Sequence, residues 1–188
     1  MVTQGDILRV LQTIDDPEMP ISIVDLGLVE KIELRTSQDG MDVSVEILPT
    51  FVGCTALPVI ESEIQRRVSA LAGVVRVNVT ISYSPAWSVD RITAAGRESL
   101  RRHGVTVPQV GEDGTINAPV CPFCGSSQVR QESAFGPTRC RAIWYCKSCR
   151  QPFEHLKRLG SGSLIDLSVQ RLPGLYTKRS HGSLEPLR

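Results

Sequence analysis

Two CxxC pairs separated by 21 residues constrain the fold of this 188-residue chain more than any other feature. Each pair fits a short turn in which two sulfurs point to one centre, so that two pairs complete a tetrahedral four-thiolate shell for zinc. A closed shell leaves no position for water or substrate, which indicates a structural rather than a catalytic metal. Iron in the same shell stays open, because tetrahedral sulfur sites suit both metals. The ligands would be Cys121, Cys124, Cys146 and Cys149.

The cellular compartment decides between a metal shell and a pair of disulfides. The first residues lack the apolar segment of a secretory signal, and no apolar run approaches the roughly 18 residues that a membrane span requires. We therefore expect a cytoplasmic protein with no membrane contact. In a reducing compartment, paired CxxC turns are metal knuckles far more often than disulfides.

The charge is distributed unevenly along the chain. Residues 1–118 carry 10 basic against 16 acidic side chains, whereas residues 119–188 carry 11 against 4. Four thiolates around a divalent metal are net negative, so part of this basicity balances the cluster and charge alone does not indicate nucleic acid.

We predict four segments along the chain. They are an α+β domain (1–107), a linker rich in proline, glycine and acidic residues (108–119), a small zinc-ribbon domain that carries the four cysteines (120–157) and a flexible basic tail (158–188).

Hydrophobic periodicity predicts the elements of the first domain. A capping box of Thr3 and Asp6 should open a helix over about 4–14. Two alternating strands around 28–34 and 43–47 follow, with a turn at 38–40, and then a helix over 56–72. The clearest strand places Val75, Val77, Val79, Ile81 and Tyr83 on one face, and a third helix should run from about 90 to 104. This order predicts a small α+β fold in which helices cover one face of a three-stranded sheet.

Cys54 is the residue of the first domain that could carry chemistry. It directly precedes the second predicted helix, where unpaired amides and the helix dipole favour a thiolate that could bind metal. A small, inert, buried thiol is the alternative. Asp16, Glu18 and Asp25 could hold a metal or share a proton, but beside proline such residues also form turns. An enzyme with Cys54 as nucleophile finds no support, because all three histidines lie far downstream.

The ribbon region contains residues that the four-ligand account does not use. Cys140 has no partner at knuckle spacing, so we predict a non-ligand thiol, and we expect His155 to lie at the surface. Aromatic residues interleaved with arginines could bind single-stranded nucleic acid, but so small a fold needs the same aromatics as packing around the metal. These residues are Phe123, Phe135, Trp144, Tyr145, Phe153, Arg130, Arg139, Arg141 and Arg150.

Three segments carry a resemblance to a known family: DPEMPISIVDLGLVEKIEL, the loop PTFVGCTAL and the strand VVRVNVTISYSPAW. Together they resemble the MIP18-type domain of iron–sulfur cluster assembly factors. With the ribbon behind it, the arrangement over residues 1 to about 157 is similar to the PaaD family, whose members are encoded with the multicomponent phenylacetyl-CoA epoxidase.

The resemblance implies an accessory subunit of the phenylacetyl-CoA 1,2-epoxidase system of aerobic phenylacetate catabolism, not its catalytic subunit. In that system a di-iron centre in another subunit makes the epoxide, and the PaaD-like chain helps to assemble or deliver iron or an iron–sulfur cluster. Cys54 matches the family's loop cysteine, and Thr55 departs from the proline that often follows it. The remaining motif positions are Asp16, Glu18, Asp25 and Gly27.

The implied partners are the oxygenase or reductase subunits, and self-association stays open. Two other functions stay open as well. One is a general iron–sulfur carrier, and the other is a zinc-ribbon interaction module that binds nucleic acid.

Overall fold

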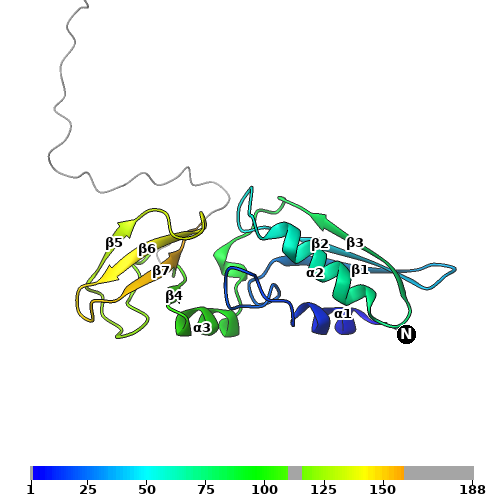
Figure 1. The fold of residues 1–188 in the computed structure, drawn as a ribbon, viewed down its shortest axis with the longest axis horizontal. Coiled ribbons are helices and arrows are strands. Elements are labelled where there is room, and N and C mark those ends of the chain that lie inside the picture. The colour runs from blue at the N-terminus through cyan, green and yellow to red at the C-terminus, as the bar shows by residue number, and fades with distance from the viewer. Residues whose placement is uncertain (1, 110–115, 159–188) are drawn as a thin grey trace, which may run out of the picture.

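The computed structural model describes residues 2–109 and 116–158, in which helices and a three-stranded sheet precede a second, four-stranded sheet (Figure 1). The elements of the first part are α1 (Gln4–Leu11), β1 (Val29–Thr36), β2 (Met41–Ile47), α2 (Leu57–Ser69), β3 (Val74–Ile81), the 3₁₀ turn η1 (Val89–Arg91) and α3 (Ala94–Arg102). The second sheet contains β4 (Val105–Thr106), β5 (Val129–Ser133), β6 (Arg141–Cys146) and β7 (Pro152–Leu156). Within the described residues, no helix combines the length and apolar composition that crossing a bilayer requires.

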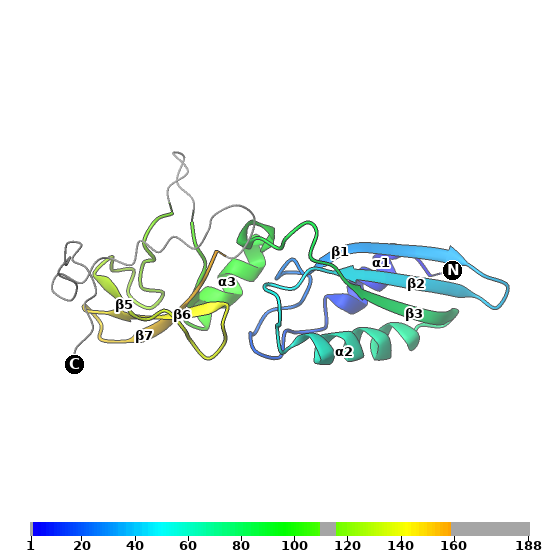
Figure 2. The same ribbon diagram turned by 90° about the horizontal axis from the view of Figure 1, so that it is seen from above.

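The first sheet has the strand order β1-β2-β3 and confirms the α+β prediction. β1 and β2 form the predicted antiparallel hairpin, whereas β2 and β3 run parallel. A parallel pair needs a crossover connection, which α2 supplies. Both α1 and α2 lie against the same face of the sheet (Figure 1 and Figure 2), and their buried residues include Ile7, Leu11, Ile60 and Ile64. The opposite face is left to solvated polar side chains.

Capping side chains open α1 and α3, whereas α2 begins without a side-chain cap. Two predicted boundaries were wrong. The capping box of Thr3 and Asp6 is present, but α1 ends at Leu11 instead of continuing to residue 14. The chain turns there through an i to i+3 bond from the Thr13 amide to the Val10 carbonyl. The third helix begins at residue 94, not 90, because the hydroxyl of Thr93 caps it by accepting the Gly96 amide at 3.0 Å.

The alternation predicted for β3 fails at Val75. Met41 pairs with Val74, but the next residue of β2, Asp42, pairs with Arg76, so Val75 is the extra residue of a β-bulge. Its side chain is half exposed instead of facing the core with Val77. A bulge places two residues opposite one and leaves the extra one unpaired, which breaks the period of two. Tyr83 lies beyond the end of the strand and is also half exposed.

The second sheet has the order β4-β7-β6-β5 and includes a strand that we assigned to the first domain. Val105 and Thr106 of β4 pair in parallel with Glu154 and His155 of β7. The boundary expected at residue 107 therefore moves to before residue 105. Of the predicted linker, residues 110–115 lie outside the described residues, and so does the predicted tail beyond Arg158.

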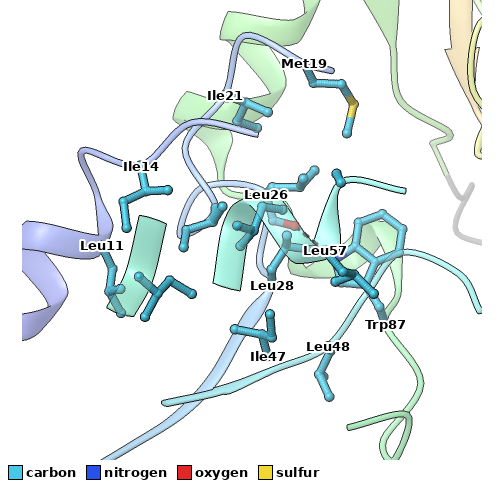
Figure 3. Close-up of a cluster of buried hydrophobic side chains, with 14 of the residues drawn as sticks. Leu11, Ile14, Met19, Ile21, Leu26, Leu28, Ile47, Leu48, Leu57 and Trp87 are labelled. Atoms are coloured by element: carbon cyan, nitrogen blue, oxygen red, sulfur yellow. Dashed lines mark hydrogen bonds between the residues drawn. The ribbon is translucent and has the colours of Figure 1, made fainter. Parts of the chain in front are cut away.

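One hydrophobic core extends from the first sheet into the ribbon. Its buried residues include Leu26, Leu57 and Trp87 of the first part (Figure 3), together with Cys140 and Leu156 of the second. The Trp87 indole donates to the carbonyl oxygen of Leu26 at 3.0 Å. A smaller cluster surrounds Cys121, Cys146 and Phe153. The large core thus joins the two units directly.

His155 is buried, so its predicted surface position was wrong. Its Nδ1 lies 2.8 Å from the hydroxyl of Thr106, and its ring meets Trp144 edge-on with centroids 5.8 Å apart. Burial lowers the pKa of His155 to about 4. His155 is buried because β4 pairs with β7, so that a strand from outside the predicted ribbon covers its ring.

Candidate metal centres

The four knuckle cysteines converge on one point, as predicted from their spacing. Their sulfur atoms all lie within 4.8 Å of one another. The Sγ atoms of Cys121 and Cys149 are 3.5 Å apart, and those of Cys124 and Cys146 are 3.6 Å apart. Zinc–sulfur bonds of about 2.3 Å in a tetrahedron require sulfur separations of about 3.8 Å. The set therefore fits a tetrahedral metal ion, and none of the six cysteines forms a disulfide.

Backbone turns hold each CxxC pair. The amide of Gly125 donates to the carbonyl of Cys121, and the amide of Arg150 donates to the carbonyl of Cys146, both at 2.9 Å. Both donor residues adopt the left-handed conformation, with φ of 73° for Gly125 and 61° for Arg150. The two knuckles thus have the same local geometry.

The ribbon site favours the thiolate of Cys146, whereas burial and the neighbouring sulfurs raise the pKa of Cys149 to about 12. The amide of Cys149 donates to the sulfur of Cys146 and lowers the pKa of that thiol to about 6, against the opposing effect of burial. Metal ligands must be deprotonated cysteines, so this amide prepares the site for a cation. Phe153 and the partly buried Trp144 pack against the buried Cys121 and Cys146, while Cys124 is exposed.

Cys54 lies in the loop between β2 and α2 and is half buried. The prediction that the helix start favours its thiolate was wrong in its net effect. Burial raises the pKa of Cys54, and the Ala56 amide that donates to the sulfur only partly offsets this. The charges of Asp16, Glu18 and Cys140 raise this pKa further. Cys54 is therefore a protonated thiol at neutral pH in a surrounding that favours cations.

Asp16 and Glu18 form a turn that faces the Cys54 loop. Asp16 is buried, and its Oδ1 accepts the Glu18 amide at 2.8 Å. Burial raises the pKa of Asp16, and the charge of Glu18 adds to this effect. Thr55, which replaces the usual proline, donates its hydroxyl to Glu18 Oε1 at 2.9 Å. This bond ties the acidic turn to the loop that carries the thiol.

Asp25 and Gly27 occupy structural positions in the same motif. Asp25 accepts the Thr93 hydroxyl at 2.6 Å and the Ser22 hydroxyl at 3.0 Å, and these bonds attach the motif to the start of α3. Gly27 has a φ of 73°, and a Cβ there would lie 2.5 Å from Cβ of Arg91. These contacts account for both residue types, and neither residue is needed as a ligand.

Two of the four ribbon arginines are paired with carboxylates of the ribbon itself. Arg141 is buried and pairs with Glu154 at 2.5 Å. Arg130 lies over the ring of Tyr145 and pairs with Glu132 at 2.6 Å. Of the aromatics, Phe153 packs against the cysteines as expected, whereas Phe123 and Phe135 are exposed and do not.

Cys140 is not a member of the four-sulfur set, as predicted. Its actual surroundings were missed. The thiol is buried in the core of the first unit, and the Thr138 hydroxyl lies 3.0 Å from its sulfur. The only signal in the sequence was an unpaired fifth cysteine in a short ribbon.

Comparisons with known proteins agree with both halves of the structure. The family described as an iron–sulfur cluster assembly protein matches residues 4–80, and the PaaD zinc beta ribbon domain matches residues 105–157. A protein of Escherichia coli, named as a putative subunit of 1,2-phenylacetyl-CoA epoxidase, is 35% identical over 156 residues, which cover 81% of this chain and 91% of the relative. The chain belongs to the PaaD family.

Two further matches cover only about half of this PaaD-family chain. An Fe-S protein maturation auxiliary factor of Porphyromonas gingivalis is 32% identical over 48% of the chain and 84% of the relative. A solved structure from Thermotoga maritima is 29% identical over 52% of the chain and 92% of that structure, with a TM-score of 0.45. The start of the PaaD ribbon match at residue 105 coincides with β4.

Proposed function

We propose that this chain is an accessory subunit of the phenylacetyl-CoA 1,2-epoxidase system that receives iron or an iron–sulfur cluster at Cys54 and passes it to a partner subunit. The observation that carries the proposal is the half-buried Cys54 thiol beside the negative charges of Asp16 and Glu18. The names of the relatives, an epoxidase subunit and a maturation auxiliary factor for Fe-S proteins, support the same system and cargo.

The protonation state of Cys54 suits a cargo that must leave again. Because its pKa is raised, metal binding has to release a proton, and reprotonation favours release. The nearby carboxylates attract a cation electrostatically, since two negative charges act on one small region. The partial exposure of the thiol leaves it accessible to a partner.

For the ribbon we propose a structural zinc ion and a docking role toward the oxygenase or reductase subunits. The sulfur geometry fits zinc, and a site closed by four protein ligands has no position left for chemistry. The six free thiols suit a reducing compartment, so we keep the expectation of a cytoplasmic protein. Nucleic acid is not part of this proposal, because Arg130 and Arg141 are engaged within the ribbon.

Replacing the thiol tests the delivery function in cells. We expect Cys54→Ser to lower the iron content of the purified partner subunits and their epoxidase activity, while the chain keeps its fold and its ribbon zinc. Val52→Ser is the matched control, because Val52 lies in the same loop, is 77% exposed and has no ligand atom. Unchanged iron content with Cys54→Ser would remove Cys54 from the function.

A further inference from the structure

Cys140 is the one cysteine that neither the ribbon metal site nor the proposed function uses. It lies directly before β6 and is 4% exposed. Although it belongs to the ribbon by sequence, it packs into the large core that contains Leu26, Leu57 and Trp87 of the first unit. Cys54 packs against that same core from the loop before α2.

The folds of both units bring these two thiols to their junction. The connection between β5 and β6 lies beside the loop that leads into α2 (Figure 1 and Figure 2). Three contacts fix Cys140 and the residue before it. The Thr138 hydroxyl lies 3.0 Å from its sulfur, the Lys157 amide donates to its carbonyl at 2.8 Å, and the Lys157 ammonium donates to the neighbouring Arg139 carbonyl at 2.9 Å.

Charge effects show that the groups at this junction act on one another. After burial, the charges of Asp16, Glu18 and Cys140 are what raise the pKa of Cys54. In the other direction, the guanidinium of Arg141, the residue after Cys140, lies close enough to Asp16 to lower its pKa against the dominant effect of burial. The segment around Cys140 therefore lies near the acidic turn as well as the Cys54 thiol.

We propose that Cys54 and Cys140 are the two sulfur ligands of one transient site at the junction of the units, which takes a thiophilic divalent cation such as ferrous iron. The inference rests on the proposed function, since it assigns a second ligand to the same cargo. Each thiol loses its proton to solvent as its sulfur binds the ion, and no electron is transferred. Asp16 and Glu18 supply negative charge beside the site.

This site differs in kind from the ribbon centre. Among the described residues, only the four ribbon cysteines bring three or more ligand atoms within 4.8 Å of one another. The junction thus offers two sulfurs from two different units and no closed cage. An incomplete shell leaves coordination positions for a partner's ligands, which is what transfer of a metal requires.

Iron binding to the full chain tests the second ligand. The zinc-loaded protein is titrated anaerobically with Fe(II) against a competing chelator, and iron K-edge X-ray absorption counts the sulfurs on each ion. We expect two sulfurs in the unmodified chain and one in Cys140→Ser, with an affinity at least about tenfold lower, or about 1.4 kcal/mol. Zinc content of one ion per chain confirms that iron has not replaced the ribbon metal.

The outcomes separate this inference from the proposed function. If Cys140→Ser keeps the affinity and the sulfur count while Cys54→Ser loses both, the two-thiol site is wrong and delivery through Cys54 stands. If Cys54→Ser also binds iron like the unmodified chain, both are wrong.

A measurement on the unmodified chain covers the case in which Cys140→Ser fails to fold. In the zinc-loaded protein, Cys54 and Cys140 are the thiols not committed to the ribbon metal. Dibromobimane becomes fluorescent when it joins two neighbouring thiols. We therefore expect a fluorescent cross-link between Cys54 and Cys140 within one chain. Binding of Fe(II) should suppress this fluorescence. Single alkylation without a cross-link would overturn the proposal.

Discussion

Arg150 adopts a backbone conformation that side chains disfavour. Its φ of 61° matches that of Gly125 at the equivalent place in the other knuckle. The left-handed conformation costs a non-glycine residue about 1–2 kcal/mol. We therefore expect Arg150→Gly to raise the free energy of unfolding of the ribbon by about 1 kcal/mol. Thermal unfolding of the zinc-loaded chain measures this.

The matched substitution in the first knuckle should act in the opposite direction. A Cβ at Gly125 meets no atom within 4 Å, so Gly125→Ala tests conformation alone. We expect it to destabilise the ribbon by about 1 kcal/mol. Equal melting temperatures for both variants would show that the zinc–sulfur bonds, not the backbone, set the stability of the knuckles.

Asp25 distinguishes a structural carboxylate from a metal ligand. Its side chain accepts hydrogen bonds from Thr93, Ser22 and Gln12. We expect Asp25→Ala to lower the free energy of unfolding by about 2 kcal/mol, because three donors lose their acceptor. Iron affinity of the folded protein at Cys54 should stay unchanged. Urea unfolding and Fe(II) titration check the two parts, and a lost affinity would make Asp25 a ligand.

At the scale of elements, the pairing of β4 with β7 depends on a neutral His155. The pKa of His155 is about 4 in the folded chain, against about 6.5 when unfolded. Between these values the unfolded chain binds more protons, so stability is complete above pH 6.5 and is lost as pH falls toward 4. We expect the unmodified chain to lose about 2 kcal/mol more than His155→Gln between pH 7 and pH 5.

Urea unfolding at each pH measures this difference, and acid effects on the zinc site are common to both proteins. His103 lies exposed at the end of α3, so His103→Gln is the control and should behave as the unmodified chain. The same pH slope in all three proteins would contradict a buried neutral His155.

Local patterns were sufficient for some elements and not for others. The capping box and the knuckles were predictable, because Thr3 and Asp6, like the two cysteines of each knuckle, lie three residues apart in the chain. The bulge at Val75, the burial of His155 and the surroundings of Cys140 depend on strand register or on segments far away in sequence. Periodicity reports which face is apolar, but not which distant strand covers it.

At the scale of the molecule, the ribbon metal should control the junction. Structural zinc supplies folding free energy to small cysteine-rich units, so we expect its removal to unfold residues 120–157. Cys140 would then leave the core of the first unit. We expect the Cys140 thiol, which is buried in the zinc-loaded chain, to become open to alkylation in the zinc-free chain.

Hydrogen exchange before and after chelation follows the unfolding, and mass spectrometry of alkylated peptides reports the exposure of Cys140. The amides of α1 are the internal control and should keep their protection after zinc removal. A ribbon that stays protected without metal would contradict the structural role of zinc.

The position of Cys140 in a core begun by the first unit also implies an order of events during synthesis. The loop with Cys54 leaves the ribosome well before the ribbon, and domains fold in the order in which they are made. A nascent chain therefore presents one thiol to iron until the ribbon closes around its own metal. Maturation of this protein would then be timed by zinc supply, and a zinc-starved cell would accumulate chains that hold their iron too weakly to deliver it.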